Sequence, residues 1–244
     1  MRARSKATHA DCQTPTRARV ACLCAAAVFF AACSSEPLSD DGALAASPAS
    51  AGTSAVAPGS GVDYEKQDYP PGPYGTGVNA TLENFAFLGW RDPVAAGYDQ
   101  TQLEQVRLSE YYDPTGSKGL KLIWINASAV WCSVCRAEMR DIKNNGVRAE
   151  FAAKGVQLVV TLFEDNKSGP ARPLDLHNWG SVPEHAIDFP LLLDPGFKLG
   201  AFFTSDATPL NMLVDARTMR VLDATMGYST DYWQGVDKLL TKLP

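Results

Sequence analysis

Basic charge, histidine and cysteine are all scarce in this 244-residue chain. Lys and Arg number 22 against 27 Asp and Glu, which argues against the basic surface that binding to nucleic acid requires. Histidine occurs three times, and only two cysteines follow residue 33. Such a chain offers few of the side chains that ligate a resident metal ion. Neither a nucleic-acid partner nor a bound metal is therefore expected.

A hydrophobic run long enough to cross a bilayer is also missing. Residues 1–19 carry five basic residues against the single acid Asp11, and residues 20–32 are then apolar and small. A basic start followed by a short apolar core is typical of a secretory signal peptide, which is removed on export. We expect residues 1–32 to be such a signal, and the mature chain to have a net charge of about −9.

Small residues stand directly before Cys33, and Ser34 follows it. This arrangement resembles the lipobox of bacterial lipoproteins, which implies that Cys33 is lipidated and becomes the mature N-terminus. In such lipoproteins, Ser34 in place of an aspartate implies that the lipid anchor is retained at the outer membrane. The rest of the protein would then lie in the periplasm. An ordinary signal peptide, cut after a small residue, is the alternative, and it would leave Cys33 as a free thiol.

The segment after this cysteine, residues 33–66, is rich in Ser, Ala, Gly and Pro. So few large apolar side chains cannot offset the entropy lost on ordering. We expect a lipid-anchored flexible linker with a reach of roughly 30 Å. The rest of the chain, residues 67–244, is long enough for one domain with a single buried core.

Two cysteines stand where a predicted strand gives way to a predicted helix. Residues 120–127 are an apolar run, and Cys135 begins a helical spacing that continues through Met139 and Ile142. The free N–H groups and the dipole of a helix N-terminus stabilise a thiolate and lower its pKa. We expect Cys132 to be the exposed, acidic, attacking thiolate and Cys135 the more buried resolving thiol. This redox-active dithiol needs no other cofactor.

Other uses of the pair remain open. A zinc site would need two more ligands, and the remaining candidates, His177 and His185, are spaced more widely than zinc-finger histidines. We otherwise expect both histidines on the surface or in loops. A purely structural disulfide would close a loop too short to remove much unfolded-state entropy.

The string Trp131-Cys132-x-x-Cys135 after an apolar strand resembles the thioredoxin superfamily. With Asn126 before it and Arg-x-Glu-Met after it, the motif is similar to the TlpA/ResA-like extracytoplasmic branch, over roughly residues 78–244. Two departures are visible, because Val134 and Arg140 stand where these proteins commonly carry prolines. The resemblance implies an α/β thioredoxin-like fold, with a central mixed sheet flanked by helices, an N-terminal hairpin and an inserted strand–helix element.

The periodicity of the sequence predicts the order of these elements. Strands are expected at 84–90, 106–112, 120–127, 156–163, 189–194, 208–215 and 220–224, and helices at 134–144, 147–154, within 170–180, at 197–203 and at 231–243.

The resemblance also implies roles for residues around the cysteines. Pro209 looks like the cis-proline of the thioredoxin fold, so Thr208 and Pro209 would contact the substrate, with Trp131 shaping the site beside them. Glu138 matches a glutamate that handles protons in ResA-like proteins, although a solvated helix surface is the alternative. Asn126 stands where thioredoxin itself carries a buried acid, and an amide cannot relay protons.

Together these features predict a lipid-anchored periplasmic thiol–disulfide oxidoreductase. Its partners would be periplasmic protein thiols or disulfides, a membrane electron donor, and the membrane itself through the lipid. Residues 133 and 134 include no histidine, which favours a reductase over a strong oxidant.

Three other functions stay open. Copper handling of the Sco-like kind uses three residues between the cysteines and a later histidine ligand, whereas the spacing here is two. A peroxiredoxin-like thiol peroxidase would carry Thr-x-x-Cys, but Ala129 stands three residues before Cys132. A non-catalytic adhesion or scaffold domain would leave the two cysteines without a use.

Overall fold

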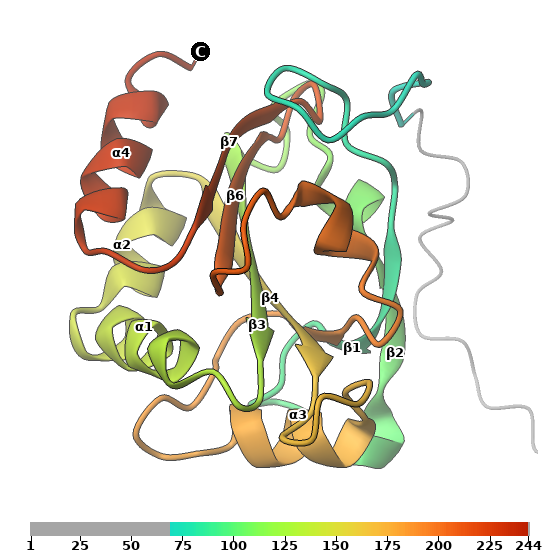
Figure 1. Ribbon diagram of the computed structural model, residues 1–244. Coiled ribbons are helices and arrows are strands. Elements are labelled where there is room, and N and C mark those ends of the chain that lie inside the picture. Colours follow the sequence, from blue (N-terminus) through green and yellow to red (C-terminus); the bar gives the residue numbers. More distant parts are fainter. Residues whose placement is uncertain (1–68, 244) are drawn as a thin grey trace, which may run out of the picture. The chain divides into compact units, whose positions relative to one another are not determined.

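The computed structural model describes residues 69–243. The predicted signal peptide at 1–32, the lipidation site Cys33 and the linker at 33–66 lie outside the described residues. The described part contains a seven-stranded sheet with the order β2-β1-β5-β4-β3-β6-β7 (Figure 1). None of its helices is both long and apolar enough to cross a membrane.

The predicted elements are present, with boundaries shifted by a few residues. The strands are β1 (Ala86–Trp90), β2 (Glu104–Arg107), β3 (Leu122–Ala129), β4 (Val156–Glu164), β5 (Leu191–Leu193), β6 (Leu210–Asp215) and β7 (Val221–Met226). The α-helices are α1 (Ser133–Asn144), α2 (Val147–Ala153), α3 (Pro173–Gly180) and α4 (Asp231–Leu240), and short 3-10 helices span Gln100–Gln102, Leu108–Tyr111 and Lys198–Phe202.

The strand β3 lies inside the sheet, between β4 and β6, and positions the cysteine pair. It runs parallel to β4 and antiparallel to β6, and all eight of its residues are buried. A strand covered on both faces explains the continuous apolar run seen in the sequence. The connection from β3 through α1 and α2 to β4 is the predicted strand–helix–strand unit, which places the start of α1 at the carboxyl end of β3.

The expected hairpin and insertion form one half of the sheet. β1 and β2 pair antiparallel, and β1 also pairs antiparallel with β5. β5 in turn runs parallel to β4, and α3 packs against β5. The sequence-based strand at 106–112 is wrong after residue 107, because a 3-10 helix, Leu108–Tyr111, follows β2 there. The carboxylate of Glu110 causes this turn, because it accepts hydrogen bonds from the backbone N–H of Arg107 and from the side chain of Arg91.

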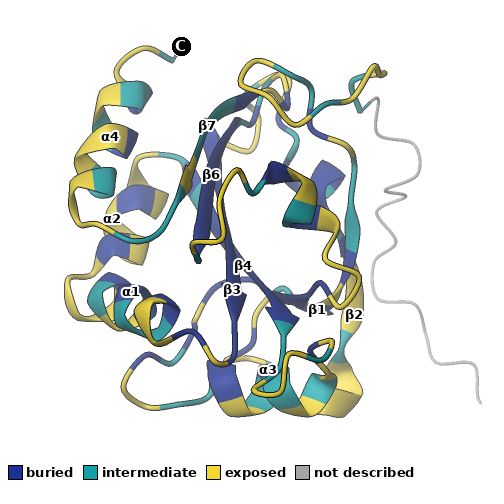
Figure 2. Ribbon diagram, in the orientation of Figure 1, coloured by how far each residue is buried: buried dark blue, intermediate teal, exposed yellow. Residues whose placement is uncertain are grey.

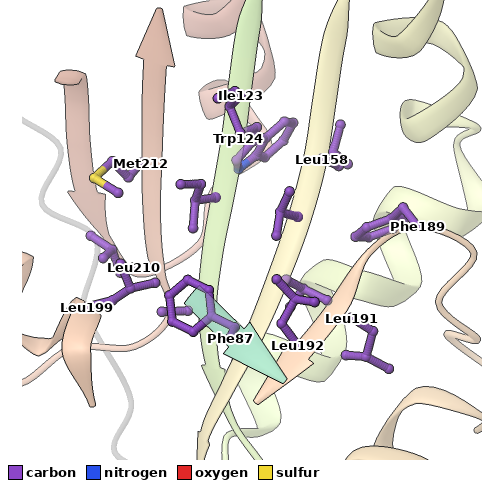
Figure 3. Close-up of a cluster of buried hydrophobic side chains, with 14 of the residues drawn as sticks. Phe87, Ile123, Trp124, Leu158, Phe189, Leu191, Leu192, Leu199, Leu210 and Met212 are labelled. Atoms are coloured by element: carbon purple, nitrogen blue, oxygen red, sulfur yellow. The ribbon is translucent and has the colours of Figure 1, made fainter. Parts of the chain in front are cut away.

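Helices α1, α2 and α4 lie along one side of the sheet, and the 3-10 turn Lys198–Phe202 lies on the other (Figure 1). Strands β3 and β5 are buried along their whole length and β4 and β6 over most of theirs, whereas the helices are buried on their inner faces only (Figure 2). The ring of Trp124 on β3 packs 5.9 Å from Phe151 of α2 and 5.3 Å from Tyr232 of α4. Figure 3 shows apolar side chains that fill the core around these strands, among them Phe87, Ile123, Leu192, Leu199, Leu210 and Met212.

Candidate active site

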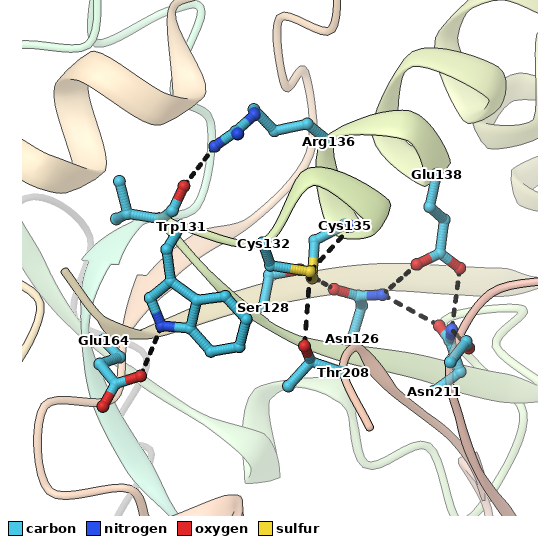
Figure 4. Close-up of a disulfide and its surroundings, with 12 residues drawn as sticks. Asn126, Ser128, Trp131, Cys132, Cys135, Arg136, Glu138, Glu164, Thr208 and Asn211 are labelled. Carbon is cyan, nitrogen blue, oxygen red and sulfur yellow. Dashed lines mark hydrogen bonds between the residues drawn. A yellow bond between two sulfur atoms is a disulfide. The ribbon is translucent and has the colours of Figure 1, made fainter. Parts of the chain in front are cut away.

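The turn between β3 and α1 holds the two cysteines in place. Cys132 is the residue that caps α1, and its backbone N–H donates to Ala129 at 3.1 Å. Its sulfur accepts the backbone N–H of Cys135 at 3.0 Å and is joined to the sulfur of Cys135 in a disulfide (Figure 4). The first sulfur therefore lies at the helix N-terminus, where a thiolate is stabilised after reduction.

The sulfur of Cys132 is covered more fully than the sequence led us to expect. Cys132 is only 3% exposed in this disulfide form, so the prediction of an exposed residue is wrong here. The hydroxyl of Thr208 lies 3.4 Å from its sulfur, at the loop that enters β6. Cys135 is fully buried, as a resolving thiol on the inner side of the helix would be.

The predicted cis-proline is confirmed as a structural feature. The Thr208–Pro209 peptide is cis, and Pro209 accepts a hydrogen bond at 2.7 Å from the backbone N–H of Gly227, just after β7. This bond anchors the loop beside the disulfide. A second cis peptide in the described residues, Gly72–Pro73, had no predictive signal in the sequence.

Trp131 presents an apolar surface next to the pair. It is 43% exposed, and its indole N–H donates to the carboxylate of Glu164 at the end of β4 (Figure 4). The guanidinium of Arg136 donates to the carbonyl of Val130 from the other side. Val134, at the position where relatives commonly carry proline, is exposed as well. Two exposed apolar side chains, Trp131 and Val134, therefore lie within three residues of Cys132 in the chain.

Glu138 lies inside the domain, so the alternative of a solvated surface position is wrong. Its side chain is fully buried on the inner face of α1. Each carboxylate oxygen accepts one amide N–H at 2.8 Å, one from Asn126 of β3 and one from Asn211 of β6. Burial raises the pKa of Glu138 to about 8, although these two hydrogen bonds act in the opposite direction.

Asn211 is the residue of the site that sequence reasoning missed. It faces Asn126 in the antiparallel register of β3 and β6, and its side-chain carbonyl accepts from the indole N–H of Trp124 at 2.7 Å and from Asn126 at 3.0 Å. An asparagine in the middle of an otherwise apolar strand was the available signal. A buried amide requires hydrogen-bond partners, and the only polar residue facing it on β3 was another asparagine.

The prediction that both histidines lie on the surface or in loops is correct only in part, because His185 lies in the loop after α3 whereas His177 lies within α3. His185 is buried, with its Nε2 2.9 Å from the carbonyl of Trp179, and burial lowers its pKa. His177 is half-buried, and its Nδ1 lies 2.7 Å from the carbonyl of Tyr98. Within residues 69–243, no three His, Cys, Asp or Glu side chains are grouped as the ligands of a metal ion would be.

Comparison with known proteins places these features in a family. The sequence profile described as "AhpC/TSA family" matches residues 93–226, which is more than half of the chain. None of the curated proteins matches the sequence significantly.

Solved structures of similar fold come from several bacteria. A protein from Chlorobium tepidum, provisionally described as the thiol:disulfide interchange protein DsbE, is 20% identical over 69% of this chain and 98% of its own, with a TM-score of 0.50. A provisional protein disulfide isomerase from Bacteroides thetaiotaomicron is 20% identical over 69% and 92% of the two chains, with a TM-score of 0.49. A secreted thiol-disulfide isomerase from Corynebacterium glutamicum is 16% identical over 66% and 85%, with a TM-score of 0.48. At these identities, the first of these similarities shows a shared thioredoxin-like fold.

Proposed function

Because the chain belongs to the AhpC/TSA family and has a thioredoxin-like fold, we propose that it is an exported thiol–disulfide oxidoreductase that reduces protein disulfides through Cys132 and Cys135. The observation that carries this proposal is the Cys132–Cys135 disulfide at the N-terminus of α1, directly beside the cis-proline loop. A helix N-terminus lowers the pKa of the first thiol, and the second is near enough to displace what the first captures.

The exchange transfers two electrons from the cysteine pair to the substrate disulfide. In the dithiol form, the thiolate of Cys132 attacks one sulfur of a substrate disulfide, and the other substrate sulfur leaves as a thiolate. Cys135 then loses its proton, attacks the sulfur of Cys132, and releases the second substrate thiolate. The product is the disulfide seen in the structure, with both substrate cysteines reduced.

Glu138 is proposed as the group that accepts the proton of Cys135. It lies three residues further along the same helix, so both residues share the inner face of α1. A pKa of about 8 is close to that of a free thiol, near 8.5, and proton transfer between groups of similar pKa has little free-energy cost. Trp131, Thr208 and Pro209 are proposed to contact the substrate, since the Thr208 hydroxyl lies 3.4 Å from the sulfur of Cys132, Pro209 follows Thr208 through a cis peptide, and the exposed Trp131 directly precedes Cys132.

The cellular setting is part of the same proposal. A lipid on Cys33 would anchor the protein at the outer membrane, with the domain in the periplasm, and the segment 33–66 would act as the linker. A membrane electron donor would return the pair to the dithiol form. Support for the anchor comes from the lipobox-like sequence alone, and the lipid can be detected directly by mass spectrometry of the mature protein.

The decisive experiment replaces Cys135 with Ser, which leaves Cys132 without a resolving partner. We expect Cys135→Ser to accumulate mixed disulfides with exported proteins, visible as adducts that dithiothreitol removes. Cys132→Ser is the matched control and should trap far less. Equal trapping by both variants, or none by either, would show that the pair does not exchange as proposed.

The direction of exchange needs a separate measurement. We expect the reduction potential of the pair to lie near the reducing end of the thioredoxin range, about −270 mV. A potential near −120 mV, typical of strong oxidants, would overturn the reductase proposal.

A further inference from the structure

The orientation of the Asn211 amide is fixed by a partner that can only donate. The indole N–H of Trp124 has no acceptor function, and it lies 2.7 Å from the side-chain carbonyl of Asn211. Turning the amide over would bring its NH₂ group against this N–H. The carbonyl oxygen of Asn211 must therefore face Trp124, and its NH₂ group must face Glu138, 2.8 Å away (Figure 4).

The orientation of Asn126 follows from that of Asn211. Its NH₂ group donates one hydrogen to the carbonyl of Asn211 at 3.0 Å and the other to Glu138 at 2.8 Å. Its own carbonyl accepts the hydroxyl of Ser128 at 2.6 Å. The second hydrogen of the Asn211 amide points to the carbonyl of Gly227, at 3.4 Å. Every polar atom of both amides thus has a partner.

Both oxygens of Glu138 consequently face N–H groups. A carboxylate accepts such hydrogen bonds, whereas a protonated carboxyl group would direct its O–H against another donor. We propose that Asn211, its amide fixed by the indole of Trp124, is a positioning residue that keeps Glu138 able to accept a proton beneath the disulfide. The role of Glu138 in exchange rests on the proposed function. The effect of the Asn211 hydrogen bond on the carboxyl group of Glu138 does not.

Other features around Glu138 favour its neutral form and so raise its pKa. Burial is the largest, and Asp141 on the same helix adds a like charge that also favours the neutral form. Tyr228, after β7, donates to Asp141 at 2.8 Å, and the half-buried Tyr232 of α4 has Asp223 beside it. The hydrogen-bond partners of Glu138 on the two facing strands, Asn126 and Asn211, are neutral. The two amides are therefore the groups that offset burial.

The test measures the titration of Glu138 itself, by carbon-13 NMR of labelled glutamate in the full-length disulfide form. Asn211→Leu removes one donor to the carboxylate, and we expect the midpoint to rise by about one pH unit. Trp124→Phe keeps the ring contacts but removes the indole N–H, so the midpoint should rise by less. Met212→Ala is the control, because Met212 is the next residue on β6, is equally buried, and makes no hydrogen bond to Glu138.

A second measurement connects this titration to the reaction. With a midpoint one pH unit higher, the ionised fraction of Glu138 near pH 7 falls about tenfold. The exchange rate should increase with pH as Glu138 ionises. The midpoint of this increase should therefore move to higher pH in Asn211→Leu and stay unchanged in Met212→Ala. If the Glu138 titration is unchanged in folded Asn211→Leu or in folded Trp124→Phe, the proposal is overturned. If Asn211→Leu does not fold, Trp124→Phe decides.

The two measurements separate this proposal from the proposed function. A shifted Glu138 titration with an unshifted rate profile supports the hold of Asn211 on the carboxyl group and removes Glu138 from the exchange mechanism. A protein without exchange activity, in which the titration still shifts as expected, would sink the proposed function and leave the positioning role of Asn211 supported.

Discussion

At the residue scale, the sequence leaves open whether Glu138 is solvated or buried, and its neighbours in the fold decide this. From the sequence it is a glutamate in the first half of a helix, a position that is usually solvated. In the structure it is fully buried and held by two asparagines on separate strands. A buried carboxyl group in this setting is a functional-site candidate, since burial without an ion pair lowers stability whenever the group is charged.

This burial predicts a pH dependence of stability. The pKa of Glu138 is raised from about 4.5 in the unfolded chain to about 8 in the folded one. The folded state therefore holds the proton more tightly, and its advantage is present below pH 4.5 and is lost as the pH rises through 8. Relative to Glu138→Gln, the free energy of unfolding of the native protein should fall by a few kcal/mol over this range.

Urea denaturation of both disulfide forms at pH 4.5, 6 and 8 checks this prediction. The comparison uses the change with pH, because Gln places an NH₂ group against an asparagine donor and lowers stability at every pH. Parallel stability profiles for the two proteins would contradict the raised pKa.

At the element scale, the pairing of β1 with β5 depends on one glycine. Gly89 of β1 lies opposite Leu192 of β5, and a Cβ atom there would come within 2.3 Å of the carbonyl oxygen of Leu191 and 2.7 Å of the Cα of Leu192. Both atoms belong to the backbone, so the clash cannot be relieved by turning a side chain. The close approach of β1 to β5 is therefore possible only without a side chain at this position.

Gly89→Ala should separate β1 from β5 and lower the free energy of unfolding by about 1–3 kcal/mol. Gly235→Ala is the matched control, because Gly235 lies inside α4 and an added Cβ would meet nothing within 4 Å. That variant should be more stable than the native protein by up to about 1 kcal/mol, since alanine favours helix. Urea denaturation measures both, and a Gly89→Ala protein of native stability would refute the close approach.

At the scale of the whole molecule, stability and redox state are linked. Closing the short loop between Cys132 and Cys135 restricts the unfolded chain and stabilises the disulfide form by about 1–2 kcal/mol in the chain-entropy description. If the protein is a reductase, its disulfide form should therefore be more stable to unfolding than its dithiol form. Strong oxidants show the reverse, because their dithiol form is stabilised.

Urea denaturation of the two forms at pH 7, with and without reductant, gives the difference in unfolding free energy. Cys132→Ser/Cys135→Ser serves as the control, since reductant should not change its stability. A dithiol form more stable than the disulfide form would show that the domain favours donation of its disulfide to other proteins.

Much of this fold is predictable because its signals are local. The apolar run at 156–163 identifies a buried strand, and the motif Trp131-Cys132-x-x-Cys135 identifies the cysteine pair through five consecutive residues. Errors arose where a distant partner decides the outcome. The 3-10 helix after β2 depends on Glu110, whose carboxylate accepts from the side chain of Arg91, 19 residues earlier in the chain.

The sequence by itself determined the order of strands and helices, the pair Cys132–Cys135 and the proline of the adjoining loop, because periodicity and motif spacing act over a few residues. Only the tertiary structure decided that Cys132 is covered and that Glu138 is buried between Asn126 and Asn211. Those two asparagines are 85 residues apart in the chain, and they meet only through the register of β3 and β6. That register is set by the packing of the whole sheet, which no local pattern records.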